Sequence, residues 1–258
     1  MQKKNCCRDL MQRVPGVLLM LIFICNFPAG FAQTPTIRNS FPVPNGYLRN
    51  TYPGGSFSQW IQDLGLKDPP IIRNHRGETV NSGFYNVWGV IQMPLLFQSN
   101  LEQCADFAMR LWAEYHKAAG KLDQLYLFEY SGTRKLFKSS GKSYVQFLKA
   151  AFANTNSFSL KQGCSKITAG EVMPGDLFVQ NERGGIGHVS IVLDVCQSKE
   201  GKRLFLIGYS FMPAQEFHIE KAQERYGIGG WFTLEGYTQY LMDYLNFGKP
   251  ALRRFDPL

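Results

Sequence analysis

The chain has 258 residues, which is enough for one sizeable domain. After residue 32 it has 24 basic and 19 acidic residues, and this net charge of +5 is spread along the sequence. The longest basic cluster there is Arg253-Arg254, so the sequence has no basic patch of the kind that binds nucleic acid. The sequence contains no Cys-x-x-Cys pair, which argues against a zinc cage.

Residues 1–32 have the pattern of a signal peptide. A basic start is followed by an apolar run over 17–27 and by small residues that end at Ala32. That run is too short to favour a membrane span, and the bulky residues before Cys25 argue against lipid attachment there; an uncleaved anchor is the alternative. We therefore expect a secreted or periplasmic protein, with no membrane contact after signal removal and a single domain over residues 33–258.

The first half of that domain is mainly helical in pattern. Pro, Gly, Asn and Ser mark residues 33–58 as a lead-in with turns, and aromatic and β-branched residues make 83–97 strand-like. The clearest helix covers 99–120, where Ser99 and Glu102 fit a capping box and Gly120 is a stop. Shorter helices are predicted at 58–66 and 144–153.

The second half changes to strand periodicity. Three segments have this pattern, at residues 176–180, 189–196 and 203–209, with a hairpin turn at 198–201. A last helix is predicted over 236–247. Helices followed by an antiparallel β-meander indicate an α+β fold.

Cys104 falls in or just after the first turn of the clearest helix. Free backbone N–H groups and the helix dipole favour negative charge at that place, so the pKa of a thiol there can be lowered, more so beside an imidazolium. The other interpretation is a small hydrophobic residue on the buried stripe of the helix.

His188 follows a glycine-rich turn at 184–187 and opens the strand at 189–196. The glycines allow close approach of backbone, and the first residue of a rigid strand is held more firmly than a loop residue. A general base for a thiol needs such placement. A structural histidine is the alternative.

A helix cysteine followed by PGDL at 174–177 and GHVSIVL at 187–193 resembles the papain-like NlpC/P60 and CHAP amidase and peptidase domains. The resemblance implies a helix packed on an antiparallel β-meander, with Cys104 as nucleophile and His188 as base. A polar residue on the following strand would orient the imidazole. Residues 116–165 would then form an insertion.

A closer resemblance covers nearly all of the chain after residue 32. The segments QCAD (103–106), MRLWAEY (109–115), GDLF (175–178) and YSFMPAQEFHI (209–219) are similar to the DUF4846 family of bacterial exported proteins. That family resemblance carries no established activity.

The hairpin brings residues 208–211 beside His188, so Tyr209 and Ser210 are the candidates for the third catalytic position. The resemblance to DUF4846 implies a glutamine where this chain has Tyr209, whose hydroxyl can also accept a hydrogen bond from the imidazole. Gln215 and His218 are interpreted as structural.

Two glutamines are candidates for stabilising an oxyanion, together with backbone N–H groups around Cys104. They are Gln98 and Gln103.

Other polar residues have simpler interpretations. Asp106, Arg110 and Glu114 stand four apart and are read as an ion-pair ladder on the helix surface, with catalytic neighbours as the alternative. His75 and His116 lack partners at metal-ligand spacing and are interpreted as surface residues.

Three cysteines follow the leader, and the sequence leaves their pairing open. Cys164 and Cys196 either form a bridge at one sheet edge, which would leave Cys104 as the lone thiol, or remain free.

The sequence thus predicts a cysteine-dependent amidase or peptidase that acts on a peptide or cell-wall glycopeptide and needs no metal or cofactor. The alternatives are an inactive binding or scaffold module of the same fold and an acyl or peptidyl transferase that uses the same thiol.

Overall fold

The computed structural model describes residues 34–81 and 83–257, and the predicted signal peptide lies outside these residues. Within the described ranges, no helix is long and apolar enough to cross a membrane.

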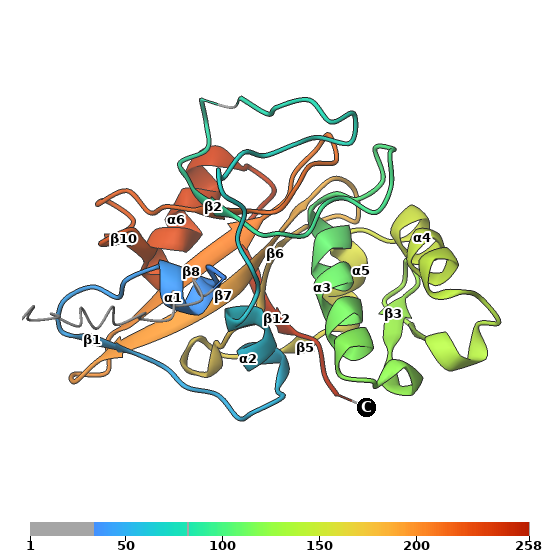
Figure 1. The fold of residues 1–258 in the computed structure, drawn as a ribbon, viewed down its shortest axis with the longest axis horizontal. Coiled ribbons are helices and arrows are strands. Elements are labelled where there is room, and N and C mark those ends of the chain that lie inside the picture. The colour runs from blue at the N-terminus through green and yellow to red at the C-terminus, as the bar shows by residue number, and fades with distance from the viewer. Residues whose placement is uncertain (1–33, 82, 258) are drawn as a thin grey trace, which may run out of the picture. The chain divides into compact units, whose positions relative to one another are not determined.

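An antiparallel sheet dominates the fold (Figure 1). Its main path runs β10-β11-β8-β7-β6-β12-β5, with β1 paired to β7 and with β9 joining β2 to β8. The strands of this sheet are β1 (Tyr47–Arg49), β2 (Val87–Val90), β5 (Ser165–Lys166), β6 (Leu177–Gln180), β7 (His188–Ser198), β8 (Arg203–Tyr209), β9 (His218–Glu220), β10 (Gly227–Ile228), β11 (Trp231–Phe232) and β12 (Ala251–Arg254). A separate hairpin joins β3 (Tyr126–Phe128) to β4 (Arg134–Leu136).

Six α-helices and three short 3₁₀ helices occur in the described part of the chain. They are α1 (Ile37–Ser40), α2 (Phe57–Gln62), α3 (Cys104–Ala118), α4 (Tyr144–Asn154), α5 (Ser157–Gly163) and α6 (Leu234–Tyr244), with η1 (Leu122–Gln124), η2 (Phe137–Ser139) and η3 (Ala169–Glu171). Together with the sheet they make a mixed α and β fold, as the sequence predicts in outline.

Strand β7 separates two hydrophobic cores. Alternate residues of a strand point to opposite faces, and Val189 and Ile191 belong to the core that contains α3 while Val192 belongs to the core that contains α6. Both faces are covered, which explains why ten of the eleven residues of β7 are buried. Each large apolar side chain that is fully buried contributes about 1.5–3 kcal/mol to folding.

Residues 116–165, which the resemblance to NlpC/P60 implies as an insertion, include the β3–β4 hairpin, α4 and α5. In Figure 1 these elements lie on the side of α3 away from β7 and β8. Phe128, Phe147 and Phe152 join the same hydrophobic core as α3. The segment is therefore an integral layer of the fold.

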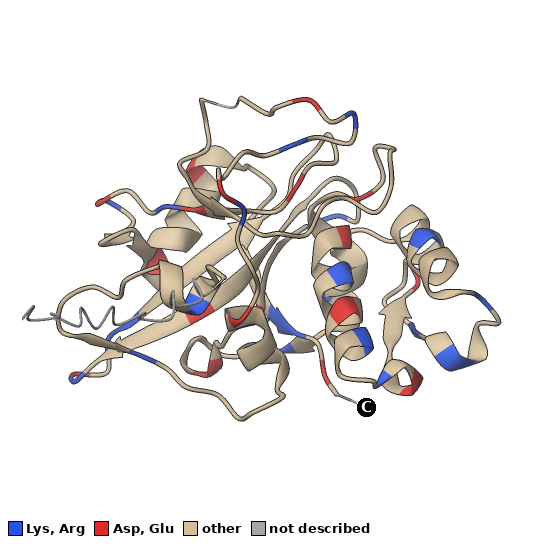
Figure 2. Cartoon of the chain, in the orientation of Figure 1, with Lys and Arg blue, Asp and Glu red and all other residues tan. Residues whose placement is uncertain are grey.

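Charged residues of both signs are interspersed along the described chain, as Figure 2 shows. This distribution agrees with the absence of a long basic run in the sequence.

The predicted hairpin of β7 and β8 is confirmed, and so is the helix over 144–153. The segment 83–97 is a strand only at Val87–Val90. Several helices and strands were not predicted from the sequence: α1, α5, β1, β3, β4, β5, β9, β10, β11 and β12.

The predicted start of the longest helix is wrong. Helix α3 begins at Cys104, and its cap is formed by Gln103 and Asp106 in place of Ser99 and Glu102. The Glu102 carboxylate accepts hydrogen bonds from the Leu96 amide (2.7 Å) and from Arg110. Those tertiary contacts take the carboxylate away from any capping role.

Candidate functional site

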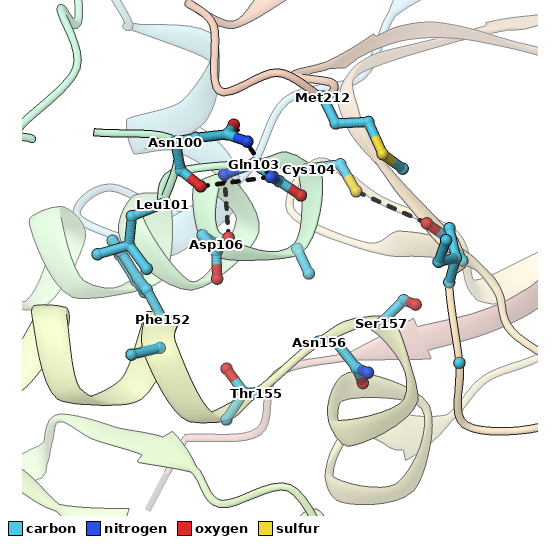
Figure 3. A pocket seen from close by; sticks show the side chains of 15 residues that line it. Asn100, Leu101, Gln103, Cys104, Asp106, Phe152, Thr155, Asn156, Ser157 and Met212 are labelled. Atoms are coloured by element: carbon cyan, nitrogen blue, oxygen red, sulfur yellow. Dashed lines mark hydrogen bonds between the residues drawn. The ribbon is translucent and has the colours of Figure 1, made fainter. Parts of the chain in front are cut away.

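A cavity of about 450 Å³ opens at the N-terminal end of α3 (Figure 3). Its walls come from residues 100–106, from the junction of α4 and α5, and from the glycine-rich loop at 185–187, with Met212 at one side. Cys104, Gln103 and Asp106 all line it, and they lie on the helix cap and the first helical turn.

The Cys104 thiol is at the wall of this cavity, and the residue is 8% exposed. The sulfur lies 4.0 Å from the carbonyl oxygen of Gly187, to which the thiol donates a weak hydrogen bond. Burial raises the pKa of Cys104 to about 11, although hydrogen bonding from the Val189 amide acts in the opposite direction. The expectation that the helix start lowers this pKa is therefore wrong for the structure as it stands, because desolvation outweighs the helix terminus.

His188 opens β7, as the sequence predicts, and is fully buried. Its ring centroid lies 5.0 Å from that of Tyr209 and 5.5 Å from that of Phe211. Neither ring nitrogen has a hydrogen-bond partner among the described residues. Burial, and then the nearby His218, lower the pKa of His188 to about 3, so the imidazole is neutral at pH 7.

The Cys104 thiol and the His188 imidazole lie at different places around the start of β7. The sulfur contacts the backbone of Gly187 and Val189, the residues on either side of His188. The His188 side chain shares the α6 face of the sheet with Ser190, whose Oγ accepts a hydrogen bond from Tyr237 of α6 (2.6 Å). His188 is not among the residues that line the cavity.

Tyr209 and Ser210 both have other polar partners. The Tyr209 hydroxyl donates to Glu220 (3.2 Å) and shares a hydrogen bond with Tyr240 (2.9 Å). The Ser210 hydroxyl donates to the backbone oxygen of Gln215 (2.6 Å). Tyr209 is thus a ring neighbour of His188 in this structure, and its hydroxyl belongs to a separate network.

A second buried histidine, His218, takes part in that network. Its ring lies 4.4 Å from the rings of both Tyr85 and Tyr209, and its Nε2 lies 3.3 Å from a carboxylate oxygen of Glu220. Burial lowers its pKa although Glu220 acts in the opposite direction. Alternation along β9 explains why His218 and Glu220 lie together, because residues 218 and 220 point to the same face of a strand.

The two candidate oxyanion residues are in different places. Gln103 caps α3 and lines the cavity beside Cys104, and its side-chain amide donates to Oδ1 of Asn100 (3.2 Å; Figure 3). Gln98 lines another cavity of about 490 Å³, together with Arg73 and His75. The structure therefore brings Gln103 to the thiol and places Gln98 elsewhere.

The predicted surface ladder on α3 is wrong. Asp106 and Arg110 are only 6% and 4% exposed. Arg110 donates to Glu102 and to the backbone oxygen of Pro94 (2.8 Å), and lies 3.8 Å from Glu114. The segment before α3 packs over this face of the helix and covers it.

The prediction that His116 lies at the surface is also wrong. It is buried against Trp112, with 4.2 Å between the ring centroids, and its Nδ1 lies 2.8 Å from the Trp112 carbonyl oxygen. His75 is half-buried.

Cys164 and Cys196 are both buried free thiols in the structure, so the bridge between them is not formed. Cys164 precedes the edge strand β5, whereas Cys196 lies within β7 near the centre of the sheet. Among the described residues, no three His, Cys, Asp or Glu side chains are grouped to hold a metal ion.

Comparison with known proteins identifies one family. The model of a domain of unknown function, DUF4846, matches residues 37–139 and 130–254. No curated protein and no solved structure matches the chain.

Proposed function

Since the chain belongs to the DUF4846 family, a family described only as a domain of unknown function, we propose a function from its own site: an exported cysteine-dependent amidase or peptidase with Cys104 as the nucleophile. One observation carries this proposal. The thiol is on the first residue of a 15-residue helix and lines a cavity of about 450 Å³.

The reaction follows the papain-like scheme. His188, neutral in the resting protein, takes the proton of the Cys104 thiol, and the sulfur attacks the carbonyl carbon of a bound amide. Backbone N–H groups at the start of α3 and the side-chain amide of Gln103 stabilise the oxyanion. The imidazolium then protonates the leaving amine, and water, with its proton taken by the imidazole, hydrolyses the thioester.

This scheme requires a movement of His188. Its ring must leave the contacts with Tyr209 and Phe211 and turn toward the sulfur, which already contacts the backbone on both sides of residue 188. The contacts of the sulfur with the backbone on both sides of residue 188 support the proposal; because the Cβ of His188 points to the α6 face, the start of β7 must turn together with the ring. The proposed substrate is a peptide or a cell-wall glycopeptide, in keeping with the predicted export.

The pH dependence of Cys104 alkylation tests the role of His188. If His188 takes the proton, the rate with iodoacetamide rises to a plateau near neutral pH, and His188→Phe removes that plateau. Without a base, a thiol of pKa about 11 gives a rate that rises about tenfold per pH unit up to that value. Peptide mass analysis separates Cys104 from Cys164 and Cys196, which serve as internal buried controls.

A binding module that has the fold without the reaction is the second candidate. It is favoured by the position of the His188 ring on the α6 face, with no hydrogen bond from either nitrogen among the described residues. Identical alkylation profiles for the wild type and His188→Phe would support this second function and contradict the first.

A further inference from the structure

The cavity beside Cys104 contains an incompletely satisfied carboxyl group. Asp106 is 6% exposed, and its Oδ2 accepts a hydrogen bond from the backbone amide of Gln103 (2.9 Å). Its Oδ1 is buried and has no hydrogen-bond partner among the described residues. Figure 3 shows one carboxyl oxygen directed into the space bounded by Phe152, Thr155 and Asn156.

Leaving such an oxygen without a partner is costly, because a buried polar atom loses its hydrogen bonds to water and gains nothing in return. The helix cap does not account for it. Capping uses Oδ2 alone, and the amide oxygen of an asparagine could make the same hydrogen bond to Gln103.

The rest of the cavity offers no competing carboxylate and no basic group. Besides Asp106 and the thiol, the polar side chains that line it are uncharged amides and hydroxyls: Asn100, Gln103, Thr155, Asn156 and Ser157. Asp106 is therefore the only carboxyl or basic side chain among the lining residues, so it decides which sign of ligand charge the cavity favours.

We propose that Asp106 is the recognition residue for an ammonium group of the ligand, which donates a charged hydrogen bond to Oδ1. The proposal rests on the proposed function in taking Cys104 as the reacting residue, and it adds the substrate class: amides that carry a nearby primary amine. Cys104 and Asp106 both line this cavity at the start of α3, but residues two apart in a helix do not face each other. The ligand must therefore extend within the cavity from the sulfur to Oδ1 of Asp106.

The pKa of Asp106 is consistent with a role in binding an ammonium group. Burial raises the pKa of Asp106, and the charge of the nearby Glu102 raises it further. A cation in the cavity would reverse that effect and hold the carboxyl group ionised, since opposite charges in a desolvated site favour the charged forms of both groups.

Charged thiol reagents test the proposal without any substrate. Aminoethyl and sulfonatoethyl methanethiosulfonate are of similar length and opposite charge. Each forms a mixed disulfide with the Cys104 sulfur and releases methanesulfinate. We expect the cationic reagent to react about tenfold faster at Cys104, each rate being divided by that of the uncharged methyl reagent. The overall charge of +8 would favour the anionic reagent. A preference for the cationic reagent must therefore arise from charges near Cys104.

Asp106→Asn keeps the capping oxygen and removes the charge, so the ratio of the two rates should fall to about one. Asp123→Asn is the matched control, because Asp123 is exposed on η1 and does not line the cavity. It should keep the wild-type ratio. The same ratio in the wild type and in Asp106→Asn would overturn the proposal.

A second measurement uses the wild type alone, in case Asp106→Asn does not fold. Butylammonium should slow the reaction of Cys104 with the uncharged reagent, and butyrate at the same concentration should not. Equal effects of the two ions would also overturn the proposal. Neither measurement depends on hydrolysis, so a failed test of His188 and a failed test of Asp106 are distinguishable.

Discussion

Replacing His188 by phenylalanine should flatten the dependence of stability on pH. The folded protein holds the pKa of His188 at about 3, against about 6.5 in an unfolded chain. Between these two pH values the unfolded chain binds one proton more, so the free energy of unfolding decreases as the pH is lowered. From pH 6.5 to pH 5.0 this one group costs about 1.5–2 kcal/mol, and His188→Phe should avoid that loss.

Urea unfolding followed by tryptophan fluorescence at several pH values measures this effect. Phe211→Leu is the matched control, because it alters the ring contact at 5.5 Å but keeps the imidazole. It should lose stability with falling pH as the wild type does. Parallel curves for the wild type and His188→Phe would refute the reasoning that an unpaired, buried, neutral imidazole is present at this position.

Three further predictions concern packing and charge. Arg49→Met should cost about 3–5 kcal/mol, measured by urea unfolding, because it removes the ion pair (2.6 Å) from the fully buried carboxylate of Asp194; a loss below about 1 kcal/mol would contradict this. Gly187→Ala should lower the free energy of unfolding by about 1–3 kcal/mol, measured by thermal melts, because a Cβ there would lie 2.2 Å from the backbone oxygen of Gln180. The same substitution should change the rate at which the Cys104 thiol is labelled. An unchanged melting temperature would show that the loop relaxes freely. Ile186→Ser should change the stability by less than about 0.5 kcal/mol, since the side chain is 72% exposed, and a large drop in the melting temperature would reveal packing that the structure lacks.

Local patterns predicted the elements that depend on local interactions. The alternation at residues 189–196 and the turn at 198–201 specify the β7–β8 hairpin, because pairing register follows from turn geometry. The start of α3 could not be found in this way. Glu102 fits a capping box by spacing, but its carboxylate is bound by Arg110 and by the Leu96 amide.

In the candidate site, too, only the features that depend on local sequence could be predicted. The placement of Cys104 in the first turn of a helix and of His188 at the start of a strand followed from periodicity. The face on which His188 lies was also implicit, since a residue next to Val189 must point away from it. The unsatisfied oxygen of Asp106 was not predictable, because residues 152–157 close the cavity from a distant part of the chain.

The position of β12 has a consequence for how the sheet is completed. This strand pairs with β6 on one side and β5 on the other, and Phe255 just after it stacks on Trp112 of α3 (5.2 Å, 9° between the ring planes). During synthesis, β6 emerges some seventy residues before β12, and until β12 is made one edge of β6 is unpaired. An unpaired strand edge can pair with other chains and lead to aggregation. The β6 edge of the sheet is therefore completed only after residues 251–254 have been synthesised, and a chaperone that keeps the nascent chain apart from its copies would protect that edge until then.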